Sequence, residues 1–225
     1  MNYQDYQPAD STRVREAIEW SITYAYNAPD ITSPRVMLIG DSICNAYQSA
    51  VRQKLEDCAN VSFWASSKCV TDPDYFRELD FMLSARPCTM VSFNNGLHSL
   101  VTPMDQWKRA YRAAVAFIRD KLPDAALVLT LCTAMNDPAR NGRVRELNSF
   151  VRRLGDELQL PVPDLFTPME ALDKDAVMTD PYHYRAPAVE QQAALIADCV
   201  RETLRLSGSG LKQAATATGP DGALR

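Results

Sequence analysis

The chain has 225 residues, of which 46% are hydrophobic and 23% charged, and this fits one globular domain with a full core. Its net charge is −4 and its basic residues are scattered, which argues against nucleic acid as a partner. No apolar run reaches the ~20 residues that span a bilayer. The polar start of the chain predicts no signal peptide. A cytoplasmic and an exported protein both stay open, as does the oligomeric state.

No internal Pro/Gly/Ser-rich linker divides the chain, so we expect a single domain over residues 1–206. From position 207 the sequence SGSGLKQAATATGPDGALR lacks apolar periodicity and predicts a disordered tail over residues 207–225. Six cysteines occur without the spacing of metal ligands, and there are only two histidines. We therefore expect no metal site.

Short apolar runs alternate with amphipathic stretches along the chain. Each run is rich in branched residues and too short for a helix, which is typical of a buried strand. The predicted strands are, in chain order, 35–40, 61–64, 89–93, 126–131 and, with the weakest pattern, 162–166.

Apolar residues recur at helical spacing between these strands and predict the intervening helices. Asp72-Pro73 and Thr102-Pro103 each resemble an N-cap followed by a proline at the first helical position. The segment 10–27 is a further candidate helix. The other predicted helices are 45–57, one after Asp72-Pro73, one after Thr102-Pro103, 144–158 and 187–204.

Strands that alternate with helices imply right-handed crossovers and a mostly parallel sheet. We therefore expect an α/β fold: a three-layer α/β/α sandwich, flavodoxin-like, with five parallel strands in the order 2-1-3-4-5. In such sheets, ligands bind at the carboxyl ends of the strands, near the point where the strand order reverses. The residues that follow each strand are thus the first place to look for chemistry.

The first strand is followed by Gly40-Asp41-Ser42-Ile43. A serine here stands at the start of a helix, where free N–H groups and the helix dipole favour an alkoxide or an oxyanion. The alternative is a turn that ends in an N-cap serine. The tripeptide alone does not decide between them, but its position at a strand end favours a nucleophile.

The third strand is followed by Asn94-Asn95-Gly96-Leu97-His98. Side-chain amides at this edge can donate hydrogen bonds to a developing oxyanion. An Asn-Gly pair is also typical of a turn. Both interpretations can hold together, with Asn95-Gly96 turning the chain while Asn94 faces the substrate.

Asp180 and His183 lie in the segment that precedes the last predicted helix. An aspartate three residues before a histidine can orient the imidazole through Nδ1, which leaves Nε2 facing a serine. The alternative is a surface loop with a capping aspartate. The scarcity of histidines and the expected topology, which brings this loop beside the first strand, favour the catalytic interpretation.

The combination of GDSI at 40–43, an asparagine after the third strand and DPYH at 180–183 resembles blocks I, III and V of the SGNH (GDSL-like) hydrolases. The resemblance covers roughly residues 34–205. It implies a serine esterase in which Ser42 is the nucleophile, His183 the general base and then acid, and Asp180 the orienting carboxylate. It also implies that no metal or cofactor is required.

The two remaining blocks depart from the family pattern. Block III usually reads G-x-N-D, and register alone places Asn95 on the family asparagine, although we rank Asn94 first because Asn95 suits the turn. Block II normally has a glycine whose N–H completes the oxyanion hole. Ser67 is our candidate there, through its backbone N–H and together with that of Ser42. His98 and Tyr182 are weaker candidates for lining the substrate cleft.

Cys44 lies two residues after the predicted nucleophile, and Cys69 lies two residues after Ser67. A disulfide between them is a hypothesis, because both loops should flank the same oxyanion hole. Such a bond would favour an exported protein.

We expect the protein to hydrolyse short-chain acyl esters through an acyl-enzyme. The substrate would be a small-molecule or carbohydrate ester, with acetylated carbohydrate as one candidate. The same residues would serve an acyltransferase, and a non-catalytic carbohydrate-binding module on the same fold is a further alternative. A nucleotide binder is disfavoured, because no Gly-rich phosphate loop follows any predicted strand.

Overall fold

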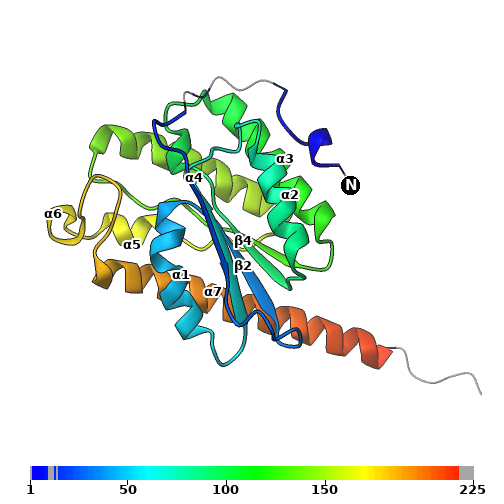
Figure 1. Cartoon of the computed structure of the whole chain (residues 1–225). Coiled ribbons are helices and arrows are strands. Elements are labelled where there is room, and N and C mark those ends of the chain that lie inside the picture. The colour runs from blue at the N-terminus through cyan, green and yellow to red at the C-terminus, as the bar shows by residue number, and fades with distance from the viewer. Residues whose placement is uncertain (1, 10–12, 14, 218–225) are drawn as a thin grey trace, which may run out of the picture.

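The computed structural model describes residues 2–9, 13 and 15–217, and it describes side chains up to residue 206. Five strands form one sheet in the order β1-β3-β2-β4-β5, and helices cover both of its faces (Figure 1). The strands are β1 (Ser21–Ala25), β2 (Arg35–Gly40), β3 (Asn60–Ser66), β4 (Met90–Phe93) and β5 (Ala126–Leu129).

The helices divide into two layers. Helices α1 and α7 pack on one face of the sheet, whereas α2, α3 and most of α4 pack on the other. They are α1 (Ser42–Lys54), α2 (Tyr75–Ala85), α3 (Met104–Lys121), α4 (Pro138–Leu158), α5 (Phe166–Glu170), α6 (Lys174–Val177) and α7 (Ala186–Ala217), with short 3-10 helices η1 (Tyr3–Asp5) and η2 (Leu97–Ser99).

Strand β2 is apolar along nearly its whole length because it is covered on both faces. Val36 and Leu38 belong to the core under α1 and α7, while Met37 and Ile39 belong to the core under α2 and α3. Continuous apolar runs of this kind are typical of central parallel strands. The structure confirms the predicted three-layer sandwich, and β3-β2-β4-β5 reproduce the predicted order of the first four strands.

The fifth strand of the sheet is not the predicted one. Segment 10–27 is a candidate helix from its sequence, but its Ser21–Ala25 part forms β1, which pairs antiparallel with β3 from Ser21↔Ser66 to Ala25↔Ser62. The sequence SITYA, with its β-branched and aromatic residues, suits a strand better than a helix. The sheet is therefore parallel except for this one edge.

The predicted strand 162–166 is absent as a strand, although the chain there runs beside β5. The N–H of Leu129 donates to the carbonyl of Pro161 at 3.0 Å, and that of Leu131 donates to Pro163 at 3.3 Å. Because proline has no N–H, neither proline can return a hydrogen bond, and the ladder stays one-sided.

The predicted N-caps Asp72 and Thr102 are also wrong. Helix α2 starts after Asp74 and α3 after Pro103, and neither start has a side-chain cap. Asp72 instead accepts hydrogen bonds from the Cys69 N–H and from Arg13.

Helix α7 continues beyond the predicted end at residue 204 to Ala217, and so enters the segment expected to be a tail. Residues 218–225, the rest of that segment, lie outside the described residues. Over the part of the chain that is described, no helix has both the length and the apolar character needed to cross a membrane.

Candidate active site

Ser42 is the first residue of α1, immediately beyond the carboxyl end of β2. Asp41 caps the helix, its Oδ1 accepting from the Ile43 N–H at 2.9 Å. The Ser42 N–H lies in the first turn, where helical geometry provides no acceptor. A Cβ on Gly40 would lie only 2.6 Å from the Cβ of Cys44, so the strand-to-helix turn requires a glycine there.

Asp180 organises the loop that faces Ser42. Its Oδ1 accepts from the backbone N–H groups of Tyr182 at 2.8 Å and His183 at 2.9 Å. Tyr184 holds the end of the loop, since its buried hydroxyl donates to the carbonyl of Ala134 at 2.5 Å. The second carboxylate oxygen of Asp180 thus remains available to the imidazole of His183.

His183 lies within hydrogen-bond distance of both other predicted catalytic residues. His183 Nε2 is 2.8 Å from Ser42 Oγ, and His183 Nδ1 is 2.7 Å from Asp180 Oδ2. Burial alone would raise the pKa of Asp180, but hydrogen bonds from the His183 side chain and from backbone N–H groups lower that pKa on balance. An ionised carboxylate favours a proton on Nδ1, which leaves the Nε2 lone pair facing the serine hydroxyl.

Ser67 does not supply the free N–H expected of it. Its backbone N–H donates to the carbonyl of Trp20 at 3.1 Å, which continues the β1–β3 pairing by one residue. Its hydroxyl donates to Glu19 at 2.6 Å and accepts from the Trp20 N–H at 2.9 Å. Ser67 therefore joins the N-terminal segment to the sheet, and its assignment to the oxyanion hole is corrected.

The backbone N–H groups that follow Ser67 are also engaged. Lys68 donates to Ser66 Oγ at 3.0 Å, and Cys69 donates to Asp72 at 2.9 Å. Val70 donates to Asn95 Oδ1 at 3.1 Å. The loop after β3 thus presents no unpaired N–H from residues 67 to 70 in this structure.

Asn94 and Asn95 are both buried, and their amides have different partners. Asn95 bridges to the loop after β3, because its Nδ2 donates to the Lys68 carbonyl at 2.9 Å while its Oδ1 accepts from Val70. Asn94 donates to the carbonyl of Thr130 at 2.8 Å and to the Cys132 sulfur at 3.5 Å. Because a thiol is a weak acceptor, the Asn94 amide hydrogen that faces Cys132 could donate to a stronger acceptor instead.

Family models and curated proteins yield no match to the chain. Solved structures, in contrast, do match it. An acetylxylan esterase from Geobacillus stearothermophilus superposes with a TM-score of 0.60 at 15% identity, over 77% of this chain and 95% of that one. A member of the lipolytic G-D-S-L family from Veillonella parvula gives 0.58 at 17% identity, over 76% and 97%.

A third neighbour, a family two carbohydrate esterase from Clostridium thermocellum, gives a TM-score of 0.55 at 15% identity, over 76% of this chain and 64% of that one. The chain has the fold of the GDSL esterases. This finding confirms the predicted resemblance at the level of the fold. In this GDSL fold, the predicted nucleophile lies at the end of the central strand β2, between the loops that follow β3 and β4.

His98 and Tyr182, the two weaker candidates for lining the substrate cleft, both contact other side chains of the protein. His98 Nδ1 lies 2.5 Å from Glu16 Oε1, and its ring meets that of Trp20 edge-on at 6.1 Å. Tyr182 is half-buried beside His183, and the Arg140 guanidinium lies over its ring at 5.6 Å and is hydrogen-bonded to its hydroxyl. His98 thus contacts Glu16 and Trp20, whereas Tyr182 lies in the loop that carries Asp180 and His183.

Cys44 and Cys69 are both free thiols, so the hypothetical disulfide is absent. Burial raises the pKa of the Cys44 thiol to about 12, and Cys69 accepts a hydrogen bond from Thr71 Oγ1 at 3.2 Å. Within the described residues, no group of three or more His, Cys, Asp or Glu side chains is placed to hold a metal ion.

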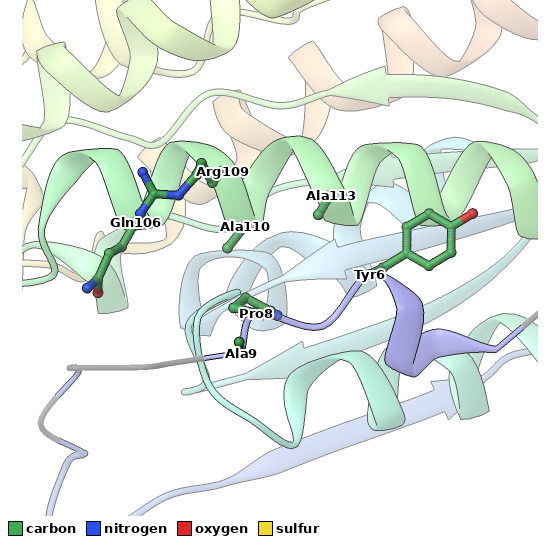
Figure 2. Close-up of a pocket in the computed structure, with 7 residues that line it drawn as sticks. All are labelled: Tyr6, Pro8, Ala9, Gln106, Arg109, Ala110 and Ala113. Atoms are coloured by element: carbon green, nitrogen blue, oxygen red, sulfur yellow. The ribbon is translucent and has the colours of Figure 1, made fainter.

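A separate groove of about 380 Å³ lies between the N-terminal segment and α3 (Figure 2). None of the predicted site residues lines this groove. Tyr6 forms one end of it, and its hydroxyl donates to Asp120 at 2.5 Å. The lining residues are Tyr6, Pro8, Ala9, Gln106, Arg109, Ala110 and Ala113.

Sequence reasoning missed the N-terminal residues that contact the site loops, namely Arg13, Glu16, Glu19 and Trp20. These residues lie in a segment without apolar periodicity, so the pattern gave no reason to place them near Ser42. The strand-forming composition of SITYA was the available indication, because it predicts pairing with an edge of the sheet.

Proposed function

We propose that this protein is a serine esterase that hydrolyses short-chain acyl esters through Ser42, His183 and Asp180. The observation that carries the proposal is the continuous hydrogen-bonded arrangement from Ser42 Oγ through His183 to Asp180, at 2.8 Å and 2.7 Å. A nucleophile, a base and a carboxylate in this order are what acyl transfer requires. The GDSL fold supports the same activity.

In the first half of the reaction, His183 Nε2 takes the Ser42 proton while Ser42 Oγ attacks the ester carbonyl. The oxyanion forms beside the start of α1, where the Ser42 N–H and the helix dipole stabilise it. Asn94 is the side chain that we assign to the same oxyanion. His183 then returns the proton to the leaving alcohol, and the acyl group stays on Ser42.

In the second half, a water molecule replaces the alcohol. His183 removes a proton from this water as it attacks the acyl-enzyme, and then protonates Ser42 Oγ as the carboxylic acid leaves. The His183 and Asp180 side chains are 43% and 44% exposed, so water can reach the imidazole without a change of the loop. An alcohol in the place of this water would give an acyltransferase, which product analysis with an alcohol acceptor distinguishes.

The proposed substrate class is an acetylated carbohydrate. Two of the neighbours are described as an acetylxylan esterase and a carbohydrate esterase, which supports this class. Tyr182, beside His183, supplies an aromatic ring on which a sugar could pack, with the Arg140 guanidinium over one face of it. A hydrolysis panel of acetyl to octanoyl esters, with acetylated xylan and p-nitrophenyl acetate, tests both halves of the substrate.

The decisive experiment labels the protein with a fluorophosphonate and locates the adduct by mass spectrometry. We expect modification of Ser42, and we expect Ser42→Ala to lower kcat for p-nitrophenyl acetate by about 10⁶-fold. Ser149→Ala is the matched control, because Ser149 is an exposed helical serine that only accepts from Arg153. Wild-type turnover in Ser42→Ala, or an adduct elsewhere, would contradict the proposal.

A further inference from the structure

Arg13 is a buried cation that the proposed mechanism does not use. Its side chain is 1% exposed, and so is that of Asp72, whose carboxylate accepts from Arg13 Nη1 at 2.5 Å. Glu19 accepts from the same nitrogen at 3.3 Å. A buried guanidinium persists only when carboxylates and carbonyl oxygens satisfy it, so this position is built around Arg13.

The remaining donors of Arg13 reach two loops at once. Its Nη2 donates to the carbonyl of Ser67 at 2.9 Å, and its Nε donates to the carbonyl of His98 at 3.2 Å. Ser67 belongs to the loop after β3 and His98 to the loop after β4. Since β3 and β4 are the two neighbours of β2, Arg13 connects the loops on either side of Ser42.

Asn95 joins the same two loops a second time, through the carbonyl of Lys68 and the N–H of Val70. The residue before it is Asn94, which we assign to the oxyanion. A shift of either loop would act on Asn94 through its peptide bond to Asn95, while the Asn94 N–H donates to the Ile39 carbonyl of β2 at 2.9 Å. The planar guanidinium can hold two carbonyls and a carboxylate in fixed directions, whereas a lysine ammonium would act as a single point charge.

We propose that Arg13 is a positioning residue for the esterase reaction: it fixes the loops after β3 and β4, and thereby positions Asn94, the side chain that we assign to the oxyanion. The proposal rests on the proposed esterase function. Arg13 acts through Asp72 and through the carbonyls of Ser67 and His98, and does not itself contact the reacting atoms. The N-terminal segment is then a functional part of the site rather than only the edge of the sheet.

The test compares Arg13→Ala with Arg15→Ala. Arg15 lies two residues away and pairs with Asp74 at 2.6 Å, but it is 44% exposed and reaches neither carbonyl. We expect Arg13→Ala to lower kcat by about 10²-fold, as a displacement of about 1 Å would, with KM within about twofold. Arg15→Ala should keep the wild-type kcat and KM.

Guanidinium rescue separates positioning from general loss of structure. At a few tens of millimolar, guanidinium chloride should restore much of the kcat of Arg13→Ala by entering the space of the lost side chain, whereas urea at the same concentration should not. Hydrogen exchange adds a readout that needs no substrate, since the amides of Cys69 and Val70 should exchange faster in Arg13→Ala. Wild-type kcat in folded Arg13→Ala overturns the proposal.

Because Arg13→Ala leaves the Asp72 carboxylate buried without its cation, this variant can fail to fold. The double variant Arg13→Met/Asp72→Asn removes both charges and keeps the volume. It should fold and still show the loss of kcat, and a wild-type kcat in it would overturn the proposal. Fluorophosphonate labelling of Ser42 in the wild type keeps the two proposals apart: no labelling there refutes the esterase, whereas equal labelling rates in wild type and Arg13→Ala refute only the role of Arg13.

Discussion

The two sides of Ser42 are built in opposite ways. On one side, Asp180 and His183 are three residues apart in one loop, and both are more than 40% exposed. On the other side, Arg13 binds Asp72 and His98, which are 59 and 85 residues away, and its side chain is 1% exposed. The proposed proton relay is thus local and exposed to solvent, whereas the side to which we assign the oxyanion depends on long-range contacts in the interior.

This difference predicts which property each side controls. Substitutions in the relay should change kcat and leave the free energy of unfolding almost unchanged, because exposed groups contribute little to stability. Substitutions on the oxyanion side should change both quantities, since a buried polar group that loses its partner destabilises the fold.

Among the substitutions that compare the two sides of Ser42, Asp180→Asn should have the largest effect. An amide in place of the carboxylate keeps the shape of the loop but no longer favours the proton on Nδ1, so kcat should fall by about 10⁴-fold. Asp175→Asn serves as the control, because Asp175 is an exposed aspartate that accepts only from Asn136 at 3.2 Å. Steady-state kinetics and a thermal melt of both variants make the measurement. A large drop in Tm for Asp180→Asn would contradict the contrast between the two sides.

The next effect separates Asn94 from Asn95. Asn94→Ala should lower kcat by about 10²–10³-fold, the usual loss for one oxyanion donor. Asn95→Ala should mainly lower stability, by about 1–3 kcal/mol, because it leaves the Val70 N–H and the Lys68 carbonyl unpaired. Urea unfolding and kinetics on the same samples measure both quantities. Equal, mild effects on kcat would count against both asparagines as oxyanion donors.

The contact between Asp180 and His183 could be predicted from the sequence, whereas the contacts of Ser67 and Arg13 could not, for a physical reason. Asp180 and His183 are three residues apart in one loop, so their side chains can meet whatever the rest of the chain does, and the local sequence was enough to predict the contact. The partners of Ser67 could not be read in this way, because its N–H reaches Trp20 only after β1 pairs with β3. Likewise, nothing near Asp72 in the sequence indicates that Arg13 will bind it.

The strands of the sheet also differ in how well the sequence predicts them. Apolar runs identified the four parallel strands β2, β3, β4 and β5, since burial on both faces leaves a strong pattern. Edge strand β1 is half-exposed and lacks that pattern. The segment beside β5 has the composition of a strand, but Pro161 and Pro163 have no N–H. It therefore accepts hydrogen bonds from β5 at these two prolines and cannot donate any there.

A smaller effect is expected at Gly40, where a Cβ would approach the Cβ of Cys44 to 2.6 Å. Gly40→Ala should cost about 1–3 kcal/mol of stability by overpacking, and should lower kcat as the start of α1 moves. Gly142→Ala provides the contrast, because a Cβ there, within α4, meets nothing within 4 Å. That change should stabilise the protein by about 0.5–1 kcal/mol. Chemical denaturation would measure both, and a stabilised Gly40→Ala would contradict the close approach.

The smallest expected effect is on pH-dependent stability. The folded-state pKa of Asp180 lies below its ordinary value of 3.8, so its contribution is complete above that value and is lost as the pH falls through the lower, folded-state pKa. Asp180→Asn should therefore slightly reduce the difference in stability between pH 6 and pH 3, as urea unfolding at the two pH values would measure. A larger difference in Asp180→Asn would reverse the sign that we infer.

Strand β1 is translated before β3, yet β3 is its only partner in the sheet. Contacts such as that between Thr23 and Phe63 span 40 residues. At roughly 5–20 residues per second of synthesis, β1 waits roughly 2–8 s for its partner to be made. During this interval β1 is an unpaired segment of β-branched and aromatic residues on the ribosome. We expect chaperones that act on nascent chains to bind such a segment.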